Sequence, residues 1–318
     1  MTDESHNVEP PTPAPPRSSL VRTIALAALI IALAVAAGLA YRHLDARRQA
    51  QATFDATARL IADADEPILR IDAVVRSEVS SATATAADAA LEDVGAADAT
   101  LVEAAARLES LPQRISDADR TYAQAFAEAI ATRRQLLADT RPVLETDRRA
   151  SAVIEPAREA WELVAQAETL SDQAIAQFNK HTKPGVQQST ALSNQAEALL
   201  TTARSNLATV TAGLPEADMA PFVDYISGKL GLLTRSKAID ATWLSDKIAD
   251  ANKLLDAYNT EEKRLAELAK ALPESPTAVI VEAYKALTEE PTERYFTSRD
   301  AVREADQRLA RIARERAR

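Results

Sequence analysis

The sequence predicts an all-α protein in which one N-terminal transmembrane helix precedes an elongated antiparallel helical bundle with coiled-coil hairpins. Only six of the 318 residues are glycine, and aromatic residues make up 4%. Alanine, leucine, glutamate and arginine are abundant and favour helix, whereas the aromatic and β-branched residues that favour strands are scarce. A single long uncharged run near the start of the chain predicts the membrane segment.

The uncharged run covers residues 23–41, between Arg22 and Arg42, and no second run like it follows. At about 1.5 Å per helical residue it is roughly 28 Å long, close to the thickness of a bilayer's hydrocarbon core. Residues 1–22 are rich in proline and are predicted to be a disordered tail. The sequence therefore predicts a chain that crosses the membrane once.

A cleavable signal peptide is the alternative interpretation of the same run. Residues 34–36 read Ala-Val-Ala, the small-x-small pattern that signal peptidase accepts. The run is longer than the usual apolar region of a signal peptide, and a proline-rich tail precedes it, so we expect an uncleaved anchor. Small residues recur every four positions along the run and either form a packing face for another membrane helix or reflect the alanine content alone. They are Ala28, Ala32, Ala36 and Ala40.

The charges that flank the run leave the orientation of the chain open. Arginines lie on both sides, and a literal count slightly favours a cytoplasmic body. Long domains, however, cross the membrane largely regardless of flanking charge. We therefore expect the protein in the cell membrane, with its large domain outside the cytoplasm.

Prolines divide the rest of the chain into helical arms. Residues 42–182 are predicted to form one long helical hairpin that turns near 111–115. Pro67 and Pro156 lie at matching distances from that turn and predict an elbow between two stacked bundles. On one side of the elbow, residues 68–110 and 116–155 would form a thin finger. On the other side, three arms of similar length would form one layer, namely 42–66, 157–182 and 186–213.

Residues 186–318 are predicted to form a second helical bundle region, which ends in an arginine-rich helix. Apolar residues alternate at steps of four and three from Leu244 to Leu272, the pattern of a coiled coil. A matching stripe occurs near the C-terminus, at Val302, Ala305, Leu309 and Ile312. The sequence predicts that these two stripes pack together.

The residues that usually carry chemistry are nearly absent. Cysteine is missing, and the three histidines are far apart in the sequence, which excludes thiolate sites and local histidine metal pairs. Three acidic residues, Asp63, Asp65 and Glu66, either bind a divalent cation or cap a helix. A net charge of −10 argues against general nucleic-acid binding. We expect no catalytic residue, metal or cofactor.

Arginines gather at the C-terminus and are the strongest candidate for a binding surface. They can contact anionic lipid, an anionic wall polymer or an acidic partner, or simply complement the negative end of a helix dipole. The five residues are Arg308, Arg311, Arg314, Arg316 and Arg318.

The function predicted from these observations is a single-pass membrane-anchored helical scaffold or interaction protein of the bacterial cell envelope. It would act through helix surfaces toward a protein partner or a second copy of itself. The alternative is an extracytoplasmic helical sensor or ligand-binding domain that signals through a partner, with its small-molecule ligand unknown. The layout resembles single-pass envelope proteins with helical-bundle or spectrin-like ectodomains, a resemblance that covers architecture only and transfers no functional residue.

Overall fold

The computed structural model describes residues 18–113 and 115–316, which are helical apart from short turns and contain no strand. The prediction of an all-α bundle is thereby confirmed. The helices in chain order are α1 (Ser18–Val75), a short 3-10 turn η1 (Ser81–Thr83), α2 (Ala84–Glu109), α3 (Asp117–Phe178), α4 (Lys183–Gly213), α5 (Ala220–Leu244), α6 (Ile248–Ala271) and α7 (Pro276–Arg316).

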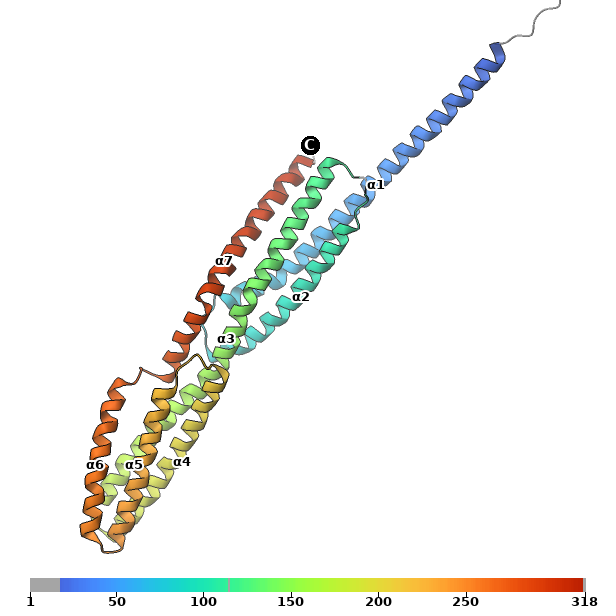
Figure 1. Ribbon diagram of the computed structural model, residues 1–318. Coiled ribbons are helices and arrows are strands. Elements are labelled where there is room, and N and C mark those ends of the chain that lie inside the picture. The colour runs from blue at the N-terminus through green and yellow to red at the C-terminus, as the bar shows by residue number, and fades with distance from the viewer. Residues whose placement is uncertain (1–17, 114, 317–318) are drawn as a thin grey trace, which may run out of the picture.

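The helices form two bundles that are joined end to end, with α3 running through both (Figure 1). The first bundle contains the part of α1 after residue 49, α2, the N-terminal half of α3 and most of α7. The second bundle contains the C-terminal half of α3, α4, α5, α6 and the start of α7. Because α3 and α7 belong to both bundles, the molecule is a single elongated body.

Each bundle has its own apolar core, and both follow the helical repeat. In α2 the buried residues from Ala90 to Ala104 recur at steps of four and three, so one stripe faces the core. Small alanines in that stripe allow the helices to approach closely. In the second bundle, larger side chains such as Phe222 and Leu207 fill the space between α3, α4 and α5. Burial of the apolar residues in these two cores stabilises helices that would be marginal in isolation.

The helix ends follow local sequence signals. Four breaks coincide with the turns that proline predicts, at 110–116, 179–182, 214–219 and 272–275. Ser116 caps α3 and Thr182 caps α4, each accepting a hydrogen bond from a backbone N–H in the first turn of its helix. Two further turns, at 76–83 and 245–247, contain no proline and were not predicted.

The predicted elbow differs from the structure. Pro67 lies inside α1 and Pro156 lies inside α3, and both helices continue past them. Buried residues flank both prolines, such as Ala64 and Ile68 around Pro67, and their packing outweighs the loss of one backbone hydrogen bond. The chain instead reverses at residues 76–83. Consequently the arm 42–66 contributes residues 50–66 to the first bundle, apart from 157–182 and 186–213 in the second.

The predicted pairing of the two apolar stripes is also wrong. Helix α6 packs against α5, whereas the C-terminal stripe of α7 packs against α3 in the first bundle. Helix α7 thus leaves the second bundle and returns along α3, with Arg299 paired to Asp72 of α1, so residues 68–110 and 116–155 do not form an isolated finger. Buried residues occur along the whole of α3, whereas in α6 only Ala251 and Leu265 are buried.

Helix α1 extends well beyond the ends of the other helices of the first bundle (Figure 1). Its backbone is helical from Ser18, and the first buried residue described in it is Ala50. Within the described part of the chain, no helix is long and apolar enough to cross a membrane. Most side chains of the predicted anchor at 23–41 lie outside the described residues, as do residues 1–17 of the predicted tail.

Candidate functional site

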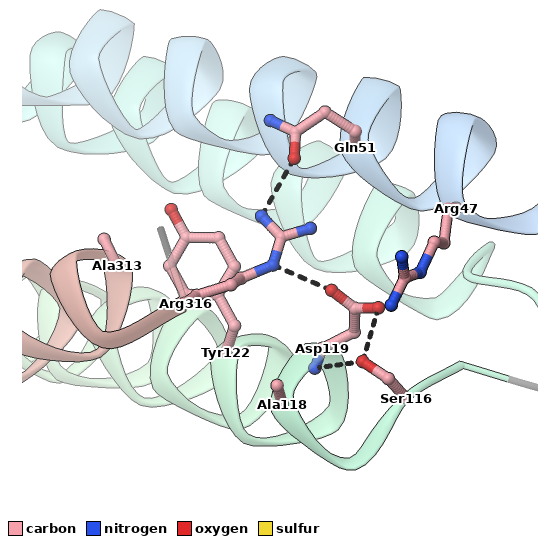
Figure 2. Close-up of a pocket in the computed structure, with 8 residues that line it drawn as sticks. All are labelled: Arg47, Gln51, Ser116, Ala118, Asp119, Tyr122, Ala313 and Arg316. Carbon is pink, nitrogen blue, oxygen red and sulfur yellow. Dashed lines mark hydrogen bonds and ion pairs between the residues drawn. The ribbon is translucent and has the colours of Figure 1, made fainter. Parts of the chain in front are cut away.

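The candidate site lies where three helix segments meet at one end of the first bundle. The last turn of α7 reaches the N-terminus of α3 and the part of α1 just before the bundle begins (Figure 2). Between them is an open cleft of about 600 Å³. Its charged and polar lining consists of Arg47 and Gln51 from α1, Ser116, Asp119 and Tyr122 from the α3 end, and Arg316 from α7.

Arg316 joins all three helices through its guanidinium group. Its Nε donates to Asp119 Oδ1 at 2.7 Å, and its Nη1 donates to Gln51 Oε1 at 2.9 Å. The same group lies 4.9 Å from the ring centroid of Phe54 and 5.1 Å from that of Tyr122. A cation over two aromatic faces, with a carboxylate at its edge, is a strong way to hold a helix end. We call this set of contacts the Arg316 latch.

Hydrogen bonds with Ser116 fix the position of Asp119 at the start of α3. Its carboxylate is almost fully buried and accepts a hydrogen bond from Ser116 Oγ at 2.7 Å, while its backbone N–H donates to the same hydroxyl. Burial alone would raise the pKa of Asp119, but the hydrogen bonds from Ser116 and Arg316 outweigh it and lower the pKa below its usual value. Asp119 is therefore ionised at neutral pH.

A cluster of three aromatic rings packs beside the Arg316 latch. The rings of Phe54 and Tyr122 meet edge to face at 4.9 Å, and those of Tyr122 and Phe126 at 4.7 Å. Phe54 and Phe126 are each 1% exposed. Since the three rings come from α1 and α3, the latch rests on a rigid apolar base rather than on flexible side chains.

A second ionic contact ties the same three helices together deeper in the bundle. Arg133 of α3 has a side chain that is 4% exposed and donates to Asp65 of α1 and to Asp306 of α7, each through two nitrogens. Burial alone would lower the pKa of Arg133, and the two aspartates raise it above its usual value. Arg299 of α7 also pairs with Asp72 of α1. Together with the latch, these pairs fix α7 along α1.

The five predicted C-terminal arginines differ in their contacts with the rest of the chain. Arg316 forms the latch, and Arg308 pairs with Glu128 of α3 at 2.7 Å, so both are used within the chain. Within the described residues Arg311 and Arg314 form no ion pair, and Arg314 donates only to the carbonyl of Ala310. Arg318 lies outside the described residues, as do the side chains of Ala28, Ala32, Ala36 and Ala40.

Two of the three acidic residues that could have bound a cation pair with arginine instead. Asp65 contacts Arg133, and Glu66 contacts Arg70. In the described ranges no cluster of three or more metal-ligating side chains occurs. The chemistry that this end of the molecule offers is ionic and aromatic contact between helices, together with an open cleft beside Arg47.

The fold and this site define an elongated, two-bundle helical protein in which the last turn of α7 packs against α1. Comparison of the chain with protein-family models, with curated protein sequences and with solved structures gives no match. Its function must therefore be argued from its own residues.

We expect Arg316→Gln to loosen the end of α7. The substitution removes the ion pair and the aromatic contacts, so amide-exchange protection in residues 305–316 should fall about tenfold at neutral pH, as expected for the loss of roughly 1–2 kcal/mol. The matched control is Arg314→Gln, whose arginine contacts only its own helix. Equal protection in the two variants would contradict the latch.

The latch should also open on acidification. A carboxylate whose pKa is lowered on folding contributes stability above its unfolded pKa of about 4, and that contribution is lost as the pH falls through the folded pKa. Protection of residues 305–316, corrected for intrinsic exchange rates, should therefore decrease below about pH 4. In Arg316→Gln this pH dependence should be weaker.

Proposed function

We propose that the protein is a single-pass membrane-anchored helical scaffold of the cell envelope, which presents the surfaces of its two bundles to a protein partner or to a second copy of itself. The observation that carries the proposal is α1, which continues as one helix from the uncharged run at 23–41 into the core of the first bundle. One continuous helix would thereby join the first bundle to the membrane anchor.

The exposure of apolar side chains on the extension of α1 supports this proposal. Leu33 is 62% exposed, Tyr41 71% and Leu44 55%, and no other helix of the described residues lies beside this segment (Figure 1). Exposed apolar side chains that the described part of the chain does not cover favour another apolar environment, and a bilayer supplies it. Tyr41 would lie at the interface, where aromatic side chains are enriched.

The positions of the arginines also agree with an anchored body. Arg47 on α1 lies beside the Arg316 latch, at the end of the first bundle that α1 enters. Arg311 and Arg314 lie on the last turns of α7, within two turns of the latch. Anionic headgroups near this end would attract these groups, each basic residue contributing about 1 kcal/mol near a charged surface. We propose separately that the body lies outside the cytoplasm, because long domains cross the membrane largely regardless of the charges that flank the anchor.

The test compares two leucines of α1 that have the same exposure. Leu33 and Leu69 are both 62% exposed, but Leu33 lies in the proposed anchor and Leu69 lies on the first bundle. The wild-type chain should stay in the membrane pellet after an alkaline carbonate wash. Ile30→Arg combined with Leu33→Arg should release it, because each central arginine costs about 2.5–3.5 kcal/mol on insertion. Leu69→Arg should leave it in the pellet.

Orientation and cleavage are tested on the same chain. Reporters that are active on only one side of the membrane would be fused at Thr2 and after Arg318, and the size of the product would show whether residues 34–36 are cut. We expect an intact chain with its C-terminal reporter active outside the cytoplasm. A wild-type chain that the carbonate wash releases would overturn the anchor, and a C-terminal reporter active inside would overturn the proposed orientation.

A further inference from the structure

A second cavity lies at the opposite end of the molecule, at the free end of the second bundle. It has a volume of about 310 Å³, is partly open to solvent and is lined by residues of α3, α4, α5 and α6. These helices converge at the end that is farthest from the C-terminus (Figure 1). Its walls include Phe178 of α3, Ser189 of α4, Ser236 and Asp240 of α5, and Tyr258 and Glu262 of α6. A space of this size is at the lower limit of small-molecule sites.

The cavity contains a buried carboxylate that has no cationic partner. Asp240 is 1% exposed and accepts a hydrogen bond from Thr190 Oγ1 at 2.9 Å. Among the described residues it forms no ion pair, and no basic side chain lines the cavity. A carboxylate removed from water without a cation is costly, and burial accordingly raises the pKa of Asp240 against the hydrogen bonds from Thr190 and Ser189.

The other walls fit an organic cation rather than a metal ion. Phe178 and Tyr258 contribute aromatic rings, whose faces attract cations, and the remaining walls include aliphatic side chains. Glu262 supplies a second acidic group on the α6 side. Burial raises the pKa of Tyr258 to about 12, so its phenol stays neutral at physiological pH. The site thus joins one buried acid to an aromatic and apolar wall.

The helix that covers the cavity is held less firmly than the others. Only Ala251 and Leu265 are buried in α6, and its main support is α5. There Leu265 packs onto Gly228 so closely that a Cβ at residue 228 would lie 2.3 Å from its Cδ2. A helix with few buried residues opens at lower cost than one with many. Movement of α6 would give a ligand access to the cavity.

We propose that this cavity binds a small organic cation, a primary or secondary ammonium carried on an aromatic or aliphatic body, with the nitrogen at Asp240 and the body between Phe178 and Tyr258. The ligand supplies the counter-charge that the protein does not. This inference does not depend on the scaffold role, since it concerns the other end of the molecule.

The experiment uses the full chain in detergent micelles and two probes of equal shape. Protonated 2-phenylethylamine is the cationic probe, and 2-phenylethanol is its neutral counterpart. Titration calorimetry and thermal unfolding should show saturable binding of the amine and a rise in Tm with its concentration. The alcohol should bind at least tenfold more weakly.

Two aspartates allow a matched control. Asp240→Asn keeps the shape and removes the charge, so we expect the affinity for the amine to fall at least tenfold. Asp147 is also a buried acid, 3% exposed and hydrogen-bonded to Ser151, but it lies at the junction of the two bundles. Asp147→Asn should leave the affinity unchanged. Circular dichroism confirms that each variant is folded.

A third variant tests the location without changing any charge. Ser236→Leu places a larger apolar side chain in the cavity and should also abolish binding of the amine. The proposal is overturned if the alcohol binds as tightly as the amine, if Asp240→Asn keeps the wild-type affinity, or if the amine does not bind the wild-type chain at millimolar concentration.

Discussion

Replacing Asp65 and Asp306 together by asparagine is expected to destabilise the protein by about 3 kcal/mol. Both aspartates pair with Arg133, whose side chain is 4% exposed, and asparagine preserves their shape while removing both negative charges. A buried cation is then left without compensation, which typically costs 3–5 kcal/mol. We expect the lower end of that range because the aspartates are 42% and 45% exposed, so water screens part of each interaction.

A rescue variant separates the charge effect from lost packing. Adding Arg133→Met to the double variant removes the uncompensated cation and retains most of the side-chain volume, so at least half of the lost stability should return. Urea unfolding followed by circular dichroism measures the free energies of the wild type, double and triple variants. A triple variant that is less stable than the double variant would contradict a charge-based penalty.

Phe222→Ala should cost about 3–5 kcal/mol and loosen the second bundle first. Phe222 is fully buried in the core of that bundle, and its ring meets that of Trp161 edge to face at 5.2 Å. Loss of a buried aromatic side chain removes apolar contact and leaves a cavity. Amide exchange should lose protection mainly in α4, α5 and the C-terminal half of α3, while α1 and α2 remain protected.

The control for this variant is an exposed phenylalanine. Phe296 is 44% exposed, so Phe296→Ala should cost only about 1 kcal/mol, through loss of partial packing and of its contact with Arg76. Uniform loss of protection over α1 to α7 in Phe222→Ala would show instead that the two bundles open as one unit.

The sequence predicts which segments are helical better than it predicts where the chain turns and which helices pack together. The helical class follows from composition, and four turns follow from prolines that stand beside the end of an apolar stripe. The elbow prediction failed because a proline inside a long helix removes one hydrogen bond, whereas the buried residues around Pro67 and Pro156 stabilise the helix on both sides. The turn at 76–83 contains no proline. Its sequence signals are serine and threonine residues, among them the capping pair Ser80 and Thr83, and these predict a turn less strongly than proline does.

The sites depend on contacts between distant parts of the chain. Arg316 is recognisable as part of a basic cluster, but its partner Asp119 is 197 residues away and cannot be identified by spacing. Asp240 carried a signal that sequence reasoning missed, since it follows the apolar residues Leu232, Leu233 and Ile239 at helical spacing and therefore falls on a buried face. An acidic residue at such a position indicates a buried polar site even when its surroundings are unknown.

The uninterrupted length of α3 separates two electrostatic environments. This helix has 62 residues and spans roughly 90 Å, with the Arg316 latch at its first turns and the cavity around Asp240 at its last. The field of a charged bilayer decays within about 8 Å at physiological ionic strength. Under the anchoring that we propose, Arg47 beside the latch follows the run at 23–41 by six residues, about 9 Å of helix. A change in lipid headgroup charge would therefore act near Arg47 but not at the cavity, whose occupancy would depend on the surrounding solution alone.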